Sequence, residues 1–295
     1  MDILIASEAG FCFGVRRALD TAREAAEEHG RIYSLGPLIH NRQVVEDLSG
    51  RGVEVVEDAA CVPPGCVAMI RTHGAGPATY AEAKARDITL IDATCPFVAR
   101  VQKAAARYQA EGYQVLVLGE RDHPEARAIV EHTGGQATIV ESAAELEDLK
   151  ITHRVAVVCQ TTQRLENLQE LIVALLPQAR ELLIENTICD ATTKRQLAAL
   201  DVARTVDLMV VVGGTHSANT SRLAQICAGA GTPTRHIETA DEIQDEWLAG
   251  VKRVGVTAGA STPDEAIQEV VARLGSLESL EASRPAPRPA KRRRK

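Results

Sequence analysis

The chain has 295 residues, of which 45% are hydrophobic, 25% charged and 3% aromatic. This length allows two or three small domains of an ordinary globular protein. So few aromatic rings leave little for bases to stack on, which argues against a single-strand nucleic-acid binder, and we expect no nucleic-acid partner.

The net charge of −7 is unevenly distributed along the chain. Residues 284–295 carry seven positive and no negative side chains, so the remainder sums to −14. A proline-spaced basic run cannot bury a core, and we expect residues 281–295 to form a disordered basic tail. Contact with an acidic partner or with nucleic acid is the alternative for this tail.

The first ten residues, MDILIASEAG, contain an acidic residue and an apolar run of only four residues. We therefore expect a first strand here and not a signal peptide, and no segment resembles a membrane span. The seven cysteines are odd in number and scattered, which favours metal binding or burial in a reducing compartment. The expected location is cytoplasmic, without a membrane partner.

Apolar β-rich runs alternate with amphipathic helical stretches along the chain. Strands, expected to be buried on both faces, are predicted at residues 3–6, 32–35, 67–72, 89–93, 115–119, 155–162, 182–186, 208–214 and 254–259. Helices are predicted at 15–29, 96–112, 164–176, 193–204 and 263–274. This alternation is typical of α/β proteins with parallel sheets.

One segment occurs three times. In each copy a cysteine opens a helical stretch, and 24 residues later a strand ends in a glycine: Cys12 to Gly36, Cys95 to Gly119 and Cys189 to Gly213. Equivalent positions of repeated units face a shared centre. We predict three similar α/β lobes with pseudo-threefold symmetry, formed by residues 13–95, by residues 96–188, and by residues 1–12 together with 189–280.

The three repeated cysteines each lie between a strand and a helix. A thiolate is stabilised at a helix N-terminus, and thiolates bind iron and zinc. Three of them do not complete a structural zinc site, and there is no C-x-x-C pair. A cubane cluster held by three cysteines would leave one iron open to a substrate oxygen. The pattern therefore predicts a central iron–sulfur cluster on Cys12, Cys95 and Cys189.

Small polar residues occupy the loops after the predicted strands. In open α/β sheets, ligands bind beyond the carboxyl ends of the strands. Hydroxyl, amide and imidazole donors there describe an anion site without Arg or Lys, suited to a diphosphate. The candidates are His40, His73, His123, Thr161, Ser217, Asn219 and Ser261.

Glu125, two residues after His123, is the one carboxylate in these loops placed to act beside such a site. Its structural interpretation is a first-turn helix residue after Pro124, where the helix dipole favours an acid. Its functional interpretation is a proton donor, because burial beside an anion raises the pKa of a carboxyl.

Nine motifs in order identify a family. GFCFGVRRA, LGPLIHN, THG, DATCPFV, HPE, QTT, TICDATTKRQ, GG-x-x-SAN and TAGAS resemble the 4-hydroxy-3-methylbut-2-enyl diphosphate reductases (LytB/IspH family), over about residues 1 to 275. The resemblance implies reductive removal of an allylic hydroxyl, giving isopentenyl and dimethylallyl diphosphates, in the last step of the non-mevalonate isoprenoid pathway. This activity makes the protein an oxidoreductase of isoprene biosynthesis.

The resemblance also implies roles for the candidate residues. A [4Fe–4S] cluster would be held by the three repeated cysteines with one iron open. Glu125 would supply protons and Thr161 would position the substrate hydroxyl. The substrate diphosphate would contact His40, His73, His123, Ser217, Asn219 and Ser261. This chain has Ala218 where the family commonly has a second serine, so we expect weaker binding but retained activity.

The chain lacks the G-x-G-x-x-G fingerprint of a nicotinamide or flavin site, so electrons must come from a carrier. Ferredoxin or flavodoxin is the expected donor. Two other classes stay open: an iron–sulfur sensor or binding protein without turnover, and a zinc-dependent hydrolase. A sensor would have no reason to keep Glu125 with three histidines, and the colour of anaerobically purified protein would exclude the hydrolase.

Overall fold

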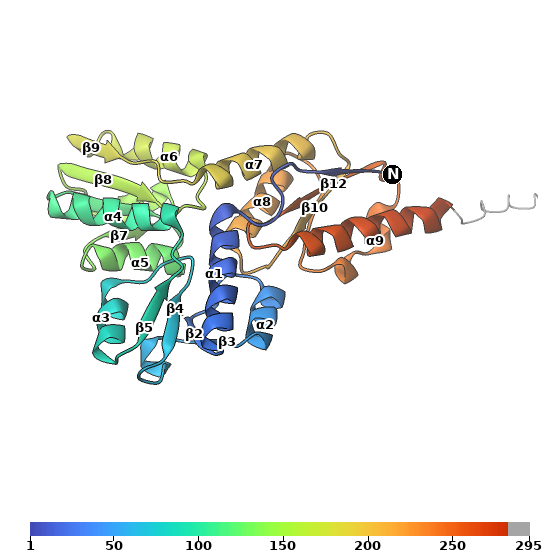
Figure 1. Cartoon of the computed structure of the whole chain (residues 1–295). Helices are drawn as coiled ribbons and strands as arrows, with labels where there is room; N and C mark the ends of the chain where they lie inside the picture. The colour runs from blue at the N-terminus through green and yellow to red at the C-terminus, as the bar shows by residue number, and fades with distance from the viewer. Residues whose placement is uncertain (283–295) are drawn as a thin grey trace, which may run out of the picture.

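The structure is a computed structural model that describes residues 1–282, with side chains for residues 1–276. It contains three parallel sheets of four strands each. Figure 1 shows the sheets with their helices as three lobes around a common centre. The strands are β1 (Asp2–Ile5), β2 (Ile32–Leu35), β3 (Val53–Val56), β4 (Val67–Ile70), β5 (Thr89–Asp92), β6 (Gln114–Leu118), β7 (Thr138–Val140), β8 (Arg154–Cys159), β9 (Glu181–Ile184), β10 (Leu208–Val212), β11 (Thr234–Ile237) and β12 (Arg253–Ala258).

Helices cover the sheets. They are α1 (Phe13–His29), α2 (Arg42–Gly50), α3 (Pro77–Ala85), α4 (Pro96–Ala110), α5 (Pro124–His132), α6 (Leu165–Leu175), α7 (Asp190–Ala203), α8 (Ala218–Gly229) and α9 (Asp264–Ala282). Short 3₁₀ turns lie at η1 (Ala59–Cys61), η2 (Ala143–Asp148), η3 (Ala240–Glu242) and η4 (Asp245–Leu248). No helix within residues 1–282 has both the length and the apolar character needed to cross a membrane.

The three sheets share one strand order. It is β3-β2-β4-β5 in the first, β7-β6-β8-β9 in the second and, read in the same sense, β11-β10-β12-β1 in the third. The third sheet takes its last strand from the N-terminus, with Asp2 opposite Arg253 and Ile5 opposite Val256. The predicted α/β fold of three similar lobes is confirmed. The exact lobe boundaries, 13–95, 96–188 and 1–12 with 189–280, stay a prediction.

Each sheet buries apolar side chains on both faces, so six hydrophobic clusters form the core. On α1, the buried positions Ala18, Leu19, Ala22, Ala25 and Ala26 recur at helical spacing. Small side chains at most of these positions let α1 pack closely on its sheet. The layered cores hold the strand ends, and with them the loops, in fixed positions.

The expectation that every predicted strand is buried on both faces is wrong for β1, β5 and β9. Each of these edge strands pairs on one side only, and its two end residues are exposed. Strands β3, β7 and β11 were not predicted, because they are only three or four residues long and two of them carry charges such as Glu54 and Arg235. The predicted disordered tail, 281–295, is wrong at its first two residues, because residues 281 and 282 end α9. From residue 283 onward the prediction lies outside the described part of the chain.

Candidate functional site

The three repeated cysteines occupy equivalent places in the fold. Cys12, Cys95 and Cys189 are the N-cap residues of α1, α4 and α7, and they follow the edge strands β1, β5 and β9. Figure 1 shows the N-terminal ends of these helices converging in the middle of the molecule. Equivalent positions of the repeat therefore meet at one centre, as the spacing predicts.

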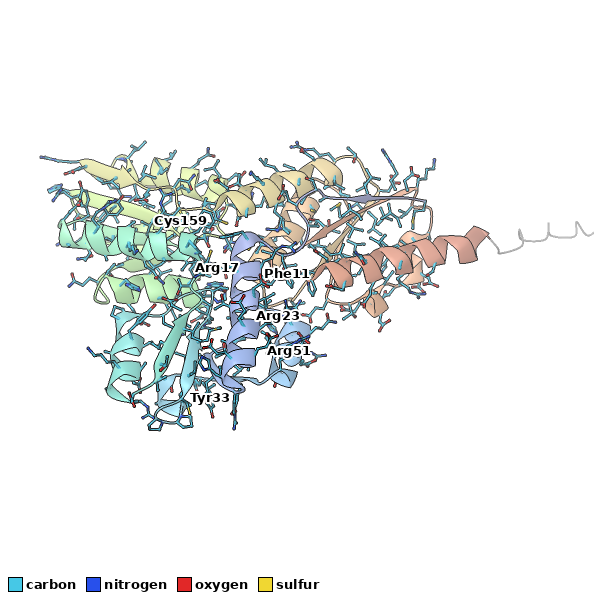
Figure 2. The ribbon with its side chains drawn as sticks, viewed as in Figure 1. Phe11, Arg17, Arg23, Tyr33, Arg51 and Cys159 are labelled. Carbon is cyan, nitrogen blue, oxygen red and sulfur yellow. The ribbon has the colours of Figure 1, made fainter. Side chains whose placement is uncertain are left out.

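The starts of α1 and α4 meet beside these thiols. A Cβ atom at Gly14 would lie 2.7 Å from Cys95 Sγ and 3.9 Å from Cys12 Sγ, so only glycine leaves room between the two sulfur atoms. Arg17 Nη1 donates to the carbonyl oxygen of Thr94 at 3.1 Å and ties α1 to the segment before Cys95. Figure 2 shows Arg17 near the start of α1, at the centre of the molecule.

Burial favours the neutral thiol at two of the three cysteines. It raises the pKa of Cys95 and of Cys189, although backbone N–H groups at the helix starts act in the opposite direction. Cys189 Sγ accepts the N–H of Thr192 at 3.3 Å and lies 2.9 Å from Thr192 Oγ1. A metal that binds here must displace thiol protons, which makes its affinity depend on pH.

The donor set fits an iron–sulfur group. Iron–sulfur clusters are held by soft thiolates, and all three equivalent N-cap positions of the repeat are cysteines. Within the described residues the cysteines do not group tightly enough to hold a single ion. They instead line a shared cavity of about 100 Å³. That wider spacing, with the room left by Gly14, suits a group larger than one ion.

Three histidines form a second wall of the same cavity. The ring centroids of His40 and His73 are 4.7 Å apart, those of His73 and His123 are 5.1 Å apart, and those of His40 and His123 are 5.7 Å apart. The imidazoles follow β2, β4 and β6, at the carboxyl ends of strands.

Several buried polar atoms on this wall lack partners among residues 1–276. They are His40 Nε2, His73 Nδ1 and both amide atoms of Asn219, whose residue is 5% exposed. A buried polar group without a hydrogen bond costs about 1–3 kcal/mol, so such groups gather where a ligand satisfies them. The wall is built to receive a polar ligand.

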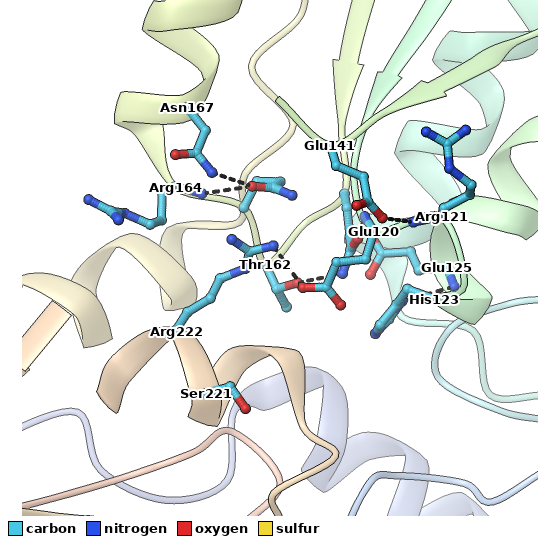
Figure 3. A network of polar contacts seen from close by, with 12 residues as sticks. Glu120, Arg121, His123, Glu125, Glu141, Thr162, Arg164, Asn167, Ser221 and Arg222 are labelled. Carbon is cyan, nitrogen blue, oxygen red and sulfur yellow. Dashed lines mark hydrogen bonds and ion pairs between the residues drawn. The ribbon is translucent and has the colours of Figure 1, made fainter. Parts of the chain in front are cut away.

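The histidines are neutral. Burial lowers the pKa of His123 to about 3 and the pKa of His73 well below 6.5, and it lowers the pKa of His40 as well. The Arg71 guanidinium adds to the lowering of all three. His123 Nδ1 accepts the backbone N–H of Glu125 at 3.2 Å (Figure 3), so the ring proton lies on Nε2. His123 can therefore donate a hydrogen bond from Nε2 without carrying a charge.

Glu125 is a buried acid held by one residue. It is 2% exposed; its Oε1 accepts the N–H of Thr161 at 2.6 Å and its Oε2 accepts the Thr161 hydroxyl at 2.9 Å. Burial raises the pKa of Glu125 to about 7, although both hydrogen bonds favour the carboxylate. Near neutral pH this carboxyl can therefore both hold and release a proton.

The raised pKa predicts a pH dependence of stability. The pKa of Glu125 is about 7 in the folded chain against an ordinary 4.5, so its contribution to folding is full below pH 4.5 and is lost as the pH rises through 7. That difference is worth on the order of 3 kcal/mol. Denaturant unfolding of the cluster-free protein measures this effect. Between about pH 4.5 and about pH 8, the free energy of unfolding of wild type should fall by on the order of 3 kcal/mol more than that of Glu125→Gln. Parallel pH profiles would contradict the raised pKa.

The structure brings all eleven predicted site residues into the one cavity, although their roles stay predictions. The lining includes Cys12, His40, His73, Cys95, His123, Glu125, Thr161, Cys189, Ser217, Asn219 and Ser261. The expectation of a site without Arg or Lys is wrong, because Arg195 also lines it. The sequence held one signal for it, its place in the motif TICDATTKRQ, but a basic residue in a helix gives no sign of burial.

A polar link joins the second and third lobes at the edge of the site. Arg222 on α8 donates to Glu120 Oε1 at 2.8 Å, and Figure 3 shows this contact bridging from α8 to the loop after β6. The Arg222 side chain is only 11% exposed. The Glu120 side chain is 40% exposed, so this half-shielded pair is a modest tie between the third lobe and the loop that carries His123 and Glu125.

The geometry defines a three-lobed α/β protein whose repeated thiols, neutral histidines and buried acid share a central cavity. The family model described as LytB protein matches residues 3–275. The chain belongs to this LytB family, which carries an iron–sulfur cluster. The resemblance predicted from the motifs is confirmed.

Curated relatives agree over nearly the full length. A "4-hydroxy-3-methylbut-2-enyl diphosphate reductase" of Geobacter metallireducens is 44% identical over 96% of this chain and 100% of its own length. A protein of the same name from Geobacter sulfurreducens is 46% identical, over 95% of this chain and 99% of its own.

Two solved structures are similar in fold. The reductase described as the terminal enzyme of the non-mevalonate pathway is 39% identical with a TM-score of 0.69, over 94% of this chain and 100% of its own. The Plasmodium falciparum reductase is 27% identical with a TM-score of 0.87, over 92% of this chain and 87% of its own.

Proposed function

We propose that this protein reduces 4-hydroxy-3-methylbut-2-enyl diphosphate to isopentenyl and dimethylallyl diphosphates and water, with two electrons and two protons. The observation that carries the proposal is one cavity lined by three N-cap thiols, three neutral histidines and the buried acid Glu125. The family and the names of its relatives support the same activity.

In this proposal Cys12, Cys95 and Cys189 hold a [4Fe–4S] cluster. When bound, the cluster supplies electrons one at a time and an iron without a protein ligand that can polarise the substrate's hydroxyl oxygen. The helix N-termini behind the three sulfur atoms favour the thiolate form that binding requires.

The diphosphate binds on the histidine wall. Neutral imidazoles and the Asn219 amide satisfy their unpartnered atoms on its oxygens. Ser217 Oγ accepts the N–H of Thr220 at 3.4 Å, which leaves the Ser217 O–H free to donate. The free N–H groups and the positive end of the helix dipole at the start of α8 also favour an anion. Ser261 completes the donor set.

Protons come from Glu125. Its carboxyl holds a proton near pH 7 and is hydrogen-bonded to the Thr161 hydroxyl, which positions the substrate's own hydroxyl group. When Glu125 is protonated, its O–H donates to Thr161 Oγ1 across the same contact, and the Thr161 proton passes to the departing hydroxyl to give water.

We propose ferredoxin or flavodoxin as the electron donor and the cytoplasm as the location. The seven cysteines are all free, which a reducing compartment preserves. A reductase without a nicotinamide or flavin fingerprint depends on a carrier protein for single electrons.

Turnover with a small reductant tests the function. Anaerobically prepared protein, given substrate and reduced methyl viologen, should oxidise the dye and form both five-carbon diphosphates. The three histidines could also hold an ion, as in a zinc hydrolase, and that enzyme would release inorganic phosphate or diphosphate without consuming reductant. Phosphate release with no dye oxidation would contradict the proposal.

Ala218→Ser should tighten substrate binding. Ala218 lines the cavity at the first position of α8, where a hydroxyl would face the bound diphosphate. A hydrogen bond to a charged group contributes about 1.5–3 kcal/mol before desolvation is subtracted, so KM should fall by up to about tenfold. An unchanged or higher KM would mean that the backbone N–H already satisfies that oxygen.

A further inference from the structure

Arg195 is a buried cation on α7 with no carboxylate partner within the described residues. The residue is 4% exposed and lines the cavity together with Cys12 and Cys189. Its Nη2 donates to the carbonyl oxygen of Gly10 at 2.6 Å, while its Nε is buried without a partner. Burying an unpaired guanidinium is costly, so a negative charge must balance it when the site is complete.

The repeat marks Arg195 as an exception. Each cluster-side helix starts one residue after its cysteine, so positions six residues after the cysteine are equivalent. The other two lobes have Ala18 and Val101 there, and both are fully buried. At this position the third lobe has, in place of an apolar core residue, a cation that lines the same cavity as the thiols.

The cluster-side cysteines can supply the charge that balances Arg195 once they are ionised. The guanidinium interacts favourably with the ionised forms of Cys12 and Cys189, and with Glu8. An arginine keeps its charge even in a buried site. Because Arg195 is buried, its fixed charge stabilises added negative charge nearby more strongly than it would in water.

We propose that Arg195 is a positioning residue that raises the reduction potential of the iron–sulfur cluster. Its charge would lie near the ligands Cys12 and Cys189, and its hydrogen bond to Gly10 holds the turn before Cys12. This inference rests on the proposed cluster on the three cysteines. The charge favours the state with one more electron, which comes from the carrier protein, and no bond is made or broken.

The hydrogen bond to Gly10 gives Arg195 its second task. Gly10 has φ +94°, and a Cβ there would lie 2.6 Å from Asp264 Oδ1, so the turn into Cys12 requires glycine. Arg195 on α7 fixes the carbonyl of this turn. The same side chain therefore orients the Cys12 ligand and places a charge beside it.

Three variants separate charge from geometry. Arg195→Gln keeps a donor for Gly10 and removes the charge, Arg195→Lys keeps the charge, and Lys194→Gln removes a charge from the exposed neighbouring position. Iron content would be measured on each purified variant. The midpoint potential would be measured by an anaerobic redox titration that is monitored by electron paramagnetic resonance. We expect the reduced-to-oxidised ratio at fixed potential to fall about tenfold in Arg195→Gln, which is about 59 mV for one electron. Arg195→Lys and Lys194→Gln should stay within about threefold of wild type.

Three results would overturn the inference. They are an unchanged potential in Arg195→Gln, an equal shift in Arg195→Lys, or loss of iron from Arg195→Gln, which would make the residue a structural support. Absence of iron from wild type would instead refute the proposed function itself.

Discussion

Replacing Cys12, Cys95 or Cys189 singly by serine is expected to remove the iron and abolish turnover while the fold stays intact. Serine is among the preferred N-cap residues, so it should support the starts of α1, α4 and α7 at least as well as cysteine. A neutral hydroxyl is a poor iron ligand, and two thiolates cannot hold a cubane. Affinity for the cluster should fall by more than the roughly 10- to 100-fold that loss of an outer-shell partner costs.

The control is Cys61→Ser, because Cys61 is an exposed cysteine outside the repeat. Its iron and sulfide content should equal wild type, and circular dichroism should show the same helix content in all four variants. Iron that follows Cys61 and ignores the N-cap cysteines would refute the ligand assignment.

Glu125→Gln is expected to lower turnover by about 10² to 10⁴, the usual contribution of a positioned general acid. The amide can keep both contacts to Thr161, accepting its N–H and donating to its hydroxyl, but it has no proton to transfer. Iron content and affinity for inorganic diphosphate should therefore stay near wild type.

Asp122→Asn is a matched control for Glu125→Gln. Asp122 lies in the same loop, but its side chain is 90% exposed and ion-paired with Arg127. Its loss should change turnover by only a few-fold, because exposed ion pairs contribute little. Turnover of Glu125→Gln within a few-fold of wild type would leave Glu125 as a helix-start residue and require another proton source.

The thiol centre could be predicted from the sequence because the repeat encodes it. Three cysteines at one spacing, each between a strand and a helix, required only that the copies pack around a centre. Loops at strand ends then placed His40 and Glu125 in the same region, since parallel strands share one carboxyl edge. At each of these positions the local sequence pattern and the strand topology predicted the same location.

Arg195 could not be predicted, because its burial depends on the packing of α7 against the turn before Cys12, which is distant in sequence. Ala18 and Val101 mark the equivalent positions as core in two copies, yet a basic residue on α7 is typical of an exposed helix face. The partial exposure of β1, β5 and β9 was missed for a related reason. Whether an apolar strand lies at a sheet edge is decided by long-range pairing, which local hydrophobicity does not record.

Iron and acid-labile sulfide, counted in anaerobically purified wild-type protein, test the central claim most directly. A cluster on Cys12, Cys95 and Cys189 predicts about four irons and four sulfides per chain, with a brown colour. The contrary result would be near-stoichiometric zinc without sulfide. That zinc would be lost when His40, His73 or His123 is replaced and retained when the cysteines are replaced, which would contradict the cluster assignment.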